Sequence, residues 1–297
     1  MSDYLWNRTN PVDDDIQRWE HTLSSLRSNR RYHLPADARR DPRHPPYAAV
    51  AAAALLAVLG PLLQRGTPNE PSRWTSEGRI LRQGQSLDTR QQPILLEAED
   101  FGQVRVGENT RIRLGRSHNL ELKQGRLHAL IWAPPGQFVV ETPSAKTIDL
   151  GCQYELEIDA EGAGLLTVET GWVAFEHGAR ESFIPAGAAC RTNPTSGPGV
   201  PYYQDAPASF RQAVQSNDIP AILAGARPRD ALTLWHLLAR VSPSERGAVF
   251  DRFRTLVPVN AERQAVVALE PVALDQCWNA LNLDSAEWWR KWKRPWR

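Results

Sequence analysis

Histidine side chains are the first groups in this chain that could bind a metal ion. His118, His128 and His177 fall within one region of the sequence and could share a metal if the fold brought them together. They are far apart in the sequence, and isolated histidines are more often surface residues or hydrogen-bonded core residues. We therefore predict no metal site.

A short acidic run, Glu97, Glu99 and Asp100, is the second candidate for chemistry. Two carboxylates at the right separation can hydrolyse a glycosidic bond, but the run precedes Phe101 and Gly102, where a solvated turn explains it better. The sequence contains no GxSxG elbow, P-loop, HExxH or GxGxxG motif. We predict that the protein is not an enzyme and uses no cofactor.

The chain has 3 cysteines, and no two of them have the CxxC spacing of a zinc site. Cys152 and Cys190 both fall in a region that we place in an oxidising compartment below, so we expect them to form a disulfide. Closing this loop would stabilise the fold by about 4 kcal/mol in the chain-entropy model. The alternative is two buried thiols that act as small apolar residues.

Residues 47–63 form an apolar stretch without any charged or amide side chain. At about 1.5 Å per residue, a helix of this length reaches the lower end of a bilayer span. Tyr47 lies at its edge, where aromatic anchors occur. We predict a transmembrane helix over residues 47–64. The alternatives are a buried core helix or the apolar part of a secretory signal, although the long preceding segment fits a signal poorly.

The residues before this stretch are rich in arginine, which fixes the predicted orientation. Basic residues close to a span resist translocation, so the N-terminus should stay in the cytoplasm and the larger part of the chain should be periplasmic, anchored in the inner membrane. The net charge of the whole chain is only +1, which argues against nucleic-acid binding. The arginines are Arg27, Arg30, Arg31, Arg39, Arg40 and Arg43.

Residues 1–46 are predicted to be a cytoplasmic arm with one short amphipathic helix over residues 13–27. Three aspartates begin this helix and favour its N-terminus. An isolated helix this short is marginal in water, so its apolar stripe needs a partner. We expect it to bind a partner protein's groove, with the membrane surface as the alternative. The predicted partner-binding residues are Ile16, Trp19, Leu23 and Leu26.

After a polar linker over residues 65–75, the sequence pattern changes to strict alternation over residues 76–200. Short alternating segments separated by turn residues predict an all-β sandwich, barrel or solenoid with one wet face on each strand. The expected strands are 103–106, 110–114, 119–122, 138–140, 154–158, 166–168 and 172–175.

Helical spacing returns in residues 205–297, and short helices joined by short loops predict a small helical domain. Asp230 is expected to cap a helix over residues 231–241, and Ser242 with Pro243 should start the next, which Pro258 ends. Further helices are expected around residues 210–214, at 222–223, and over 271–281 and 285–292.

The C-terminal tail interleaves tryptophans with arginines and lysines. An end helix docked by its tryptophans is one interpretation, and binding to an anionic membrane surface is the other. Nucleic acid is not expected as a ligand in this compartment. The tryptophans are Trp288, Trp289, Trp292 and Trp296.

Three motifs stand out in the β region. The first is Gly125 at the expected end of a strand, the second is FVVETP at residues 138–143, and the third is LGCQYEL at residues 150–156. Together they resemble the core of the FecR family of single-span membrane sensors and anti-sigma factors. VETGWV at residues 168–173 and PAG at residues 185–187 resemble the next repeats. The resemblance covers residues 76–191. Cys152 replaces the family's usual threonine.

This resemblance implies a FecR-like β-solenoid or sandwich followed here by an added helical domain. It also implies a function in signal transduction. The cytoplasmic arm would bind a sigma factor, and an envelope protein or ligand outside would change how strongly the arm binds it. The segment after residue 200 does not resemble the small signalling domain found in iron-uptake members. The alternative function is an envelope scaffold that binds glycan or protein, with the arm as a simple anchor.

Overall fold

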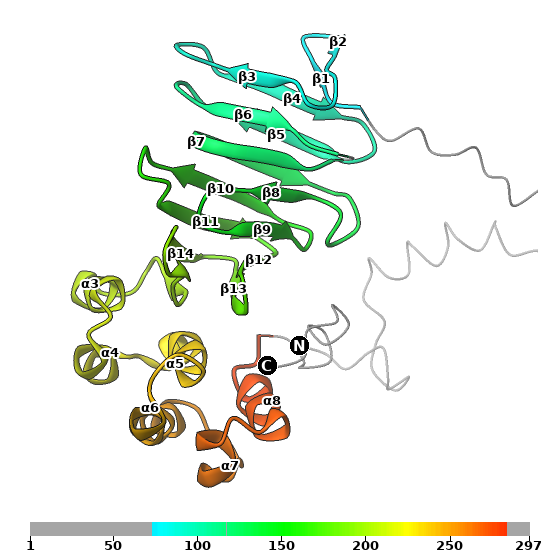
Figure 1. Ribbon diagram of the computed structural model, residues 1–297. Helices are drawn as coiled ribbons and strands as arrows, with labels where there is room; N and C mark the ends of the chain where they lie inside the picture. Colours follow the sequence, from blue (N-terminus) through cyan, green and yellow to red (C-terminus); the bar gives the residue numbers. More distant parts are fainter. Residues whose placement is uncertain (1–72, 117, 284–297) are drawn as a thin grey trace, which may run out of the picture. The chain divides into compact units, whose positions relative to one another are not determined.

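The computed structural model describes residues 73–116 and 118–283, which fold into strands followed by helices (Figure 1). The predicted arm, the predicted transmembrane segment 47–64 and the predicted terminal helix 285–292 lie outside these residues. In the described ranges, no helix combines the length and the apolar character that crossing a membrane requires. The expected order of a mainly β region followed by helices is confirmed there.

The strands are short, and most alternate between buried and exposed side chains, as the sequence pattern predicted. They are β1 (Thr75–Ser76), β2 (Arg79–Ile80), β3 (Ser86–Asp88), β4 (Ile94–Ala98), β5 (Gly102–Val106), β6 (Arg111–Leu114), β7 (Leu120–Ile131), β8 (Val139–Glu141), β9 (Lys146–Asp149), β10 (Gln153–Ile158), β11 (Gly164–Thr170), β12 (Trp172–His177), β13 (Arg180–Pro185), β14 (Ala188–Asn193), β15 (Gly197–Pro198) and β16 (Tyr202–Tyr203).

The strands form two sheets that share β7. Sheet A has the order β2-β1-β4-β5-β7-β10-β11-β14, with β15 and β16 both paired to β14. Sheet B has the order β3-β6-β7-β8-β9-β12-β13. Neighbouring strands are antiparallel except for β7 and β8, which are parallel. Because the first half of β7 pairs with β6 and β8 and its second half with β5 and β10, one strand joins the two sheets.

β7 changes sheets at Gly125, where its pattern of burial also shifts by one residue. Leu120 and Leu122 are buried before this point, and Leu127 and Ala129 are buried after it. An irregularity in the pairing with β6 supplies the extra residue. The sequence analysis expected a strand only over residues 119–122 with Gly125 at its end. That boundary was wrong, because the shift interrupts the alternation on which the prediction relied.

Thr110 packs against the backbone of β7 at the crossing. Its hydroxyl accepts a hydrogen bond from the Arg126 N–H at 3.0 Å, and its own N–H donates to the Thr89 hydroxyl at 2.9 Å. Thr110 is fully buried. Gly125 has a φ of +102°, and a Cβ atom on it would lie 2.5 Å from Thr110 Cα. The crossing therefore requires glycine for both its backbone conformation and its lack of a side chain.

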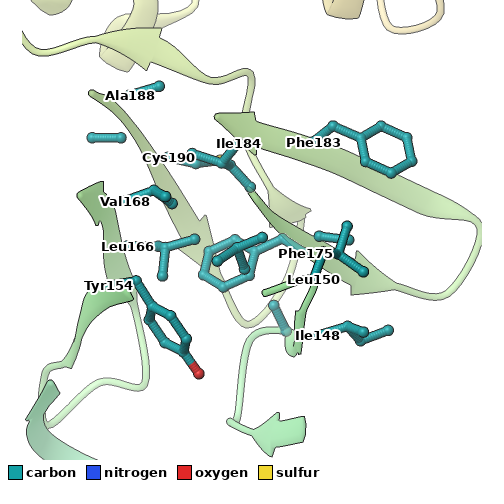
Figure 2. Packing of buried hydrophobic residues seen from close by; sticks show 14 of the residues in the cluster. Ile148, Leu150, Tyr154, Leu166, Val168, Phe175, Phe183, Ile184, Ala188 and Cys190 are labelled. Carbon is teal, nitrogen blue, oxygen red and sulfur yellow. The ribbon is translucent and has the colours of Figure 1, made fainter. Parts of the chain in front are cut away.

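The core lies between the two sheets (Figure 2). Side chains of β10, β11 and β14 point toward those of β12 and β13. Leu166 and Val168 from β11 are fully buried, as are Phe175 from β12 and Ile184 from β13. On β11, Leu166 and Val168 alternate with half-buried neighbours, so the period of two in the sequence corresponds to this core. β12 and β13 are instead buried on both faces along their central residues.

Six helices and one 3-10 turn follow the sheets. They are α3 (Ala208–Ser216), α4 (Ile219–Gly225), η1 (Pro228–Asp230), α5 (Ala231–Leu238), α6 (Pro243–Leu256), α7 (Arg263–Val267) and α8 (Pro271–Ala280) among the described residues. α6 begins at Pro243 after Ser242, as predicted, and Ser242 and Glu245 form a capping box at its start, which was not predicted. Asp230 differs from expectation: its carboxylate accepts from Arg227 rather than capping α5. The short helix α7 was not predicted.

Gly125→Ala should lower the free energy of unfolding by about 3 kcal/mol or more, since the new methyl group collides with Thr110 and the backbone becomes strained. Gly84→Ala is the matched control. Gly84 also has a positive φ, +81°, but a Cβ there meets nothing closer than an Arg113 side-chain atom at 4.0 Å. The control should cost about 1 kcal/mol. Equal losses in urea unfolding of the two variants would contradict a tight crossing.

Candidate functional site

The predicted partner-binding residues lie outside the described part of the chain. They are Ile16, Trp19, Leu23 and Leu26 of the arm. The tryptophans of the tail, Trp288, Trp289, Trp292 and Trp296, also lie outside it. The described residues offer three other features that could matter for function: a buried acidic cluster, a hydrogen-bonded junction between sheet B and α5, and two surface hollows.

Cys152 and Cys190 do not form the expected disulfide. Both are free and buried. The Cys152 thiol donates to the Asp149 carboxylate, and the Cys190 thiol donates to the Gly199 carbonyl at 3.2 Å. The alternative of two buried thiols describes this structure better.

The pairing of the strands explains why the bridge is absent. β11 lies between β10 and β14, and Leu166 of β11 is opposite both Leu156 and Cys190. Cys152 precedes Leu156 by four residues. Two strand spacings and this offset together separate the two cysteines by roughly 15 Å, whereas a disulfide needs Cα atoms within about 7 Å.

Asp149, at the end of β9, is a carboxylate buried in the core, with only 1% of its surface exposed. Its Oδ1 accepts from the Gly151 N–H at 2.7 Å, and its Oδ2 accepts from the Cys152 thiol. Burial raises the pKa of Asp149 to about 6, although these hydrogen bonds partly oppose the rise. The pKa of Tyr154 is also raised, mainly by burial and then by the nearby Asp149.

This cluster is structural rather than nucleophilic. Burial raises the pKa of the Cys152 thiol first, and the Asp149 charge raises it further, so the thiol stays protonated and donates its hydrogen. A threonine hydroxyl could make the same donation, which gives a physical reason why cysteine can stand where the FecR-like motif usually has threonine. An acid inside the apolar run Ile148–Leu150 was a signal in the sequence that could have revealed this cluster.

The junction between sheet B and α5 is the second feature. β13 is the last strand of sheet B, and among residues 73–116 and 118–283 no strand pairs with the second side of its backbone. The N–H of Phe183 donates to His236 Nε2 at 3.1 Å, while His236 Nδ1 bonds to the Leu232 carbonyl at 2.9 Å. Burial lowers the pKa of His236 to about 3, and Arg240 lowers it further. The imidazole is therefore neutral and can accept from the strand.

Arg240, just after α5, satisfies acceptors of two strands. Its guanidinium donates to the Glu181 carbonyl at 2.7 Å and to the Pro198 carbonyl at 3.0 Å. It also donates to the Ser182 hydroxyl. His236 and Arg240 are four residues apart, so both reach the same edge of β13. An open sheet edge can pair with other chains, and these two side chains block this part of it.

Aromatic rings complete the junction. Trp278 of α8 lies 4.7 Å from Trp235 of α5, 5.8 Å from Trp172 of β12 and 6.0 Å from Phe183 of β13, measured between ring centroids. The Trp235 indole donates to the Leu274 carbonyl at 3.1 Å. Sheet B, α5 and α8 are thus held by both apolar packing and directional hydrogen bonds. Trp235 and Trp278 fall within predicted helices, but the contacts between these aromatic rings were not predicted.

Two hollows open on the surface of the described region. One, of about 390 Å³, has a mixed polar and apolar lining that includes Trp172, Tyr203 and Leu281, with the Arg229 guanidinium 4.0 Å from the centre of the Tyr203 ring. The other, of about 500 Å³, is lined by both polar and apolar residues of β10, β11, β14 and α3, including Arg191. Both fall within the size range of small-molecule sites.

The histidines and acids named in the sequence analysis are not brought together. His118 stacks on Phe101 with ring centroids 3.6 Å apart, and His128 lies on sheet A, where it contacts Glu169 at 3.1 Å. His177 ends β12. Within the ranges that the structure describes, no group of three or more histidine, cysteine or acidic residues could hold a metal ion.

Comparison with known proteins gives limited information. No protein-family model matches the chain, and no curated protein matches it. Two crystal structures of a "putative anti-sigma factor" from Parabacteroides distasonis, at 2.50 Å and 1.65 Å resolution, are similar to it with 17% identity and a TM-score of 0.35. The match covers 43% of this chain and 63% of theirs, less than two thirds of their length. A TM-score this low supports neither a shared fold nor a shared function.

Asp149→Asn should change how stability depends on pH. The folded-state pKa of Asp149 is about 6, above the ordinary 3.8, so its stabilising effect is complete below pH 3.8 and is lost as the pH rises through 6. The variant should lose this pH-dependent gain, which is about 2 kcal/mol between pH 7 and pH 4. Urea unfolding across this range measures it. Asp159→Asn, at an exposed site, is the control and should keep the parental profile.

His236→Gln should change the pH dependence of the free energy of unfolding in the opposite sense to Asp149→Asn. The folded-state pKa of His236 is about 3, below the ordinary 6.5, so its contribution is present above pH 6.5 and is lost as the pH falls toward 3. The variant should be about 1–3 kcal/mol less stable at pH 7, because a flexible amide replaces the rigid imidazole that bonds both to the Phe183 N–H and to the Leu232 carbonyl. Its stability should fall less steeply in acid. The exposed His177→Gln is the control. Parental acid sensitivity in the His236 variant would refute this role.

Proposed function

We propose that the chain is a single-pass inner-membrane regulator of the FecR type, with the N-terminus in the cytoplasm and residues 65–297 in the periplasm. Its cytoplasmic arm binds a sigma factor, and a signal received by the periplasmic part changes that binding. The protein is a regulator and not an enzyme. The observation that carries the proposal is the order of segments: an arginine-rich arm with an apolar stripe, an apolar stretch over residues 47–63, and then the β region.

The positions of the FecR-like motifs support the assignment of the β region. Gly125 occupies the point where β7 changes sheets, and a Cβ atom there would collide with Thr110. Thr142 of the second motif closes a turn, where its hydroxyl donates to the Ala145 carbonyl at 2.7 Å. Cys152 of the third motif donates to Asp149. The residues that carry the resemblance therefore have structural tasks within the two sheets and in a turn of sheet B, as expected if they define a domain.

The junction between sheet B and the helices gives this proposal a physical route for the signal. Because His236 and Arg240 bond directly to the backbone of β13, the sheets and the helices should respond to a ligand as one unit. A signal at either part would then act on the linker over residues 65–75 and through the membrane on the arm. The competing function is an envelope scaffold, in which the arm serves only as an anchor.

Protease treatment of spheroplasts tests the topology. A tag placed before Pro45 should be protected, while a tag after Thr75 should be lost, because only the second would face the periplasm. Protection of both tags together with a soluble protein after lysis would overturn the membrane proposal.

Trp19→Ala tests the partner. If Trp19 anchors the arm in a groove, the full chain should retain a sigma factor at least about thirtyfold less strongly after this change, a loss of about 2 kcal/mol. The sigma factor is identified by mass spectrometry of the purified complex. Trp6→Ala changes a tryptophan outside the predicted helix and is the matched control. Equal retention of a sigma factor by both variants would rule out Trp19 as the anchor. Capture of partners only by the periplasmic part would favour the scaffold.

A further inference from the structure

The outer face of sheet A carries an exposed tryptophan. Residues of β7 that point away from the core include His128 and Leu130, and Trp132 continues this row just beyond the strand. Leu130 is 41% exposed and Trp132 is 51% exposed, whereas Ala129, between His128 and Leu130, is fully buried. Exposed apolar side chains that are neighbours on a polar sheet face, unlike single ones, indicate an interaction site.

Trp132 is held in one orientation. Its indole Nε1 donates to the Glu99 carbonyl at 3.1 Å, and its backbone N–H donates to the Phe101 carbonyl at 3.1 Å. These bonds fix the ring at the end of β7 while half of its surface stays open to solvent. A fixed ring loses little conformational freedom when a ligand packs against it, which favours binding.

Paired amides and carboxylates flank Leu130 on both sides. In the register of the sheet, Gln103 of β5 and Gln153 of β10 are the neighbours of Leu130. Gln103 Nε2 donates to Glu97 Oε1 at 3.2 Å, and Gln153 Nε2 donates to Glu169 Oε2 at 2.6 Å. In each pair the hydrogen bond orients the amide and the carboxylate. Both groups still have hydrogen-bonding positions that a ligand can use.

The charges of this face restrict what it can bind. On β4, β5, β7, β10 and β11 this face carries more carboxylates than guanidinium groups: those of Glu97, Glu155, Glu157 and Glu169 against those of Arg105 and Arg126. Arg126 is already engaged with Glu155 at 3.7 Å and Glu157 at 3.2 Å. The excess of negative charge disfavours nucleic acid, phosphate and an anionic membrane surface as ligands. A peptide strand is recognised through an open sheet edge, and this is the flat side of the sheet.

We propose that this face is a binding site for an uncharged, β-linked glycan strand. One face of a pyranose ring of this type presents C–H groups that can pack on the Trp132 indole. Its equatorial hydroxyls lie at the rim, where Gln103, Gln153 and the adjacent carboxylates can donate and accept hydrogen bonds. A flat, ribbon-like sugar chain matches a flat sheet face with an aromatic ring beside paired polar groups.

This inference names a ligand class for the periplasmic part, and in that respect it rests on the proposed function. The binding itself can be measured without the sigma factor or the topology. Loss of sugar binding would therefore leave the arm's role untouched, and an arm without a partner would leave the sugar site untouched.

Isothermal titration calorimetry on the full chain, held in a zwitterionic rather than a sugar-based detergent, is the test. Chitohexaose and cellohexaose are the probes, because they share a β-1,4 backbone and differ in the N-acetyl group. Hexalysine is the probe for a cationic ligand. We expect saturable binding of at least one hexasaccharide, and binding of only one would distinguish N-acetylated from plain glycans as the source.

Trp132→Ala should weaken this binding by at least about tenfold, Trp132→Phe should weaken it less, and Gln153→Ala should weaken it severalfold. Val272→Ala removes another exposed apolar side chain, on α8, and should bind like the parent. Unfolding curves of each variant separate lost binding from lost folding. Absence of saturable binding by both sugars, binding of hexalysine alone, or parental affinity in a folded Trp132→Ala variant would overturn the proposal.

Discussion

The contact between Gly125 and Thr110 is the constraint on which the β region depends. It allows one strand to leave sheet B and enter sheet A without a break in its backbone. The buried Thr110 hydroxyl satisfies the Arg126 N–H where the regular ladder is interrupted, and the missing side chain of Gly125 leaves room for it. Both sheets are then anchored to the same strand, and their inward side chains can meet in one core.

The edges of these sheets matter as much as their centre. At β13 the free backbone groups are bonded by side chains of the helical part, so the end of sheet B is covered by polar contacts and by the aromatic cluster around Trp278. A neutral histidine is suited to this position because it accepts from the strand with one nitrogen and donates to its own helix with the other. The helices therefore have a structural task in the β region and are more than an appended domain.

Sequence reasoning recovered the order of strands and helices because their periodicity is local. Alternation along β10 and the start of α6 at Ser242 and Pro243 depend on residues a few positions apart, and both were predicted. The full length of β7 could not, because its period shifts at Gly125. The predicted disulfide between Cys152 and Cys190 was wrong for a related reason. It rested on the compartment that both residues were expected to share, and this does not determine which strands are neighbours. His236 and Arg240 contact residues more than forty positions away, which no local pattern encodes.

The shared strand β7 also determines where this protein can be divided. In a two-sheet domain whose sheets are joined only by loops, one sheet can be separated or replaced without cutting a ladder of hydrogen bonds. Here any boundary drawn between the sheets passes through β7 itself, whose two halves have partners both before and after it in the chain. The two sheets should consequently fold in a single cooperative step once β10 is available, and neither sheet alone is a module that could be exchanged between proteins.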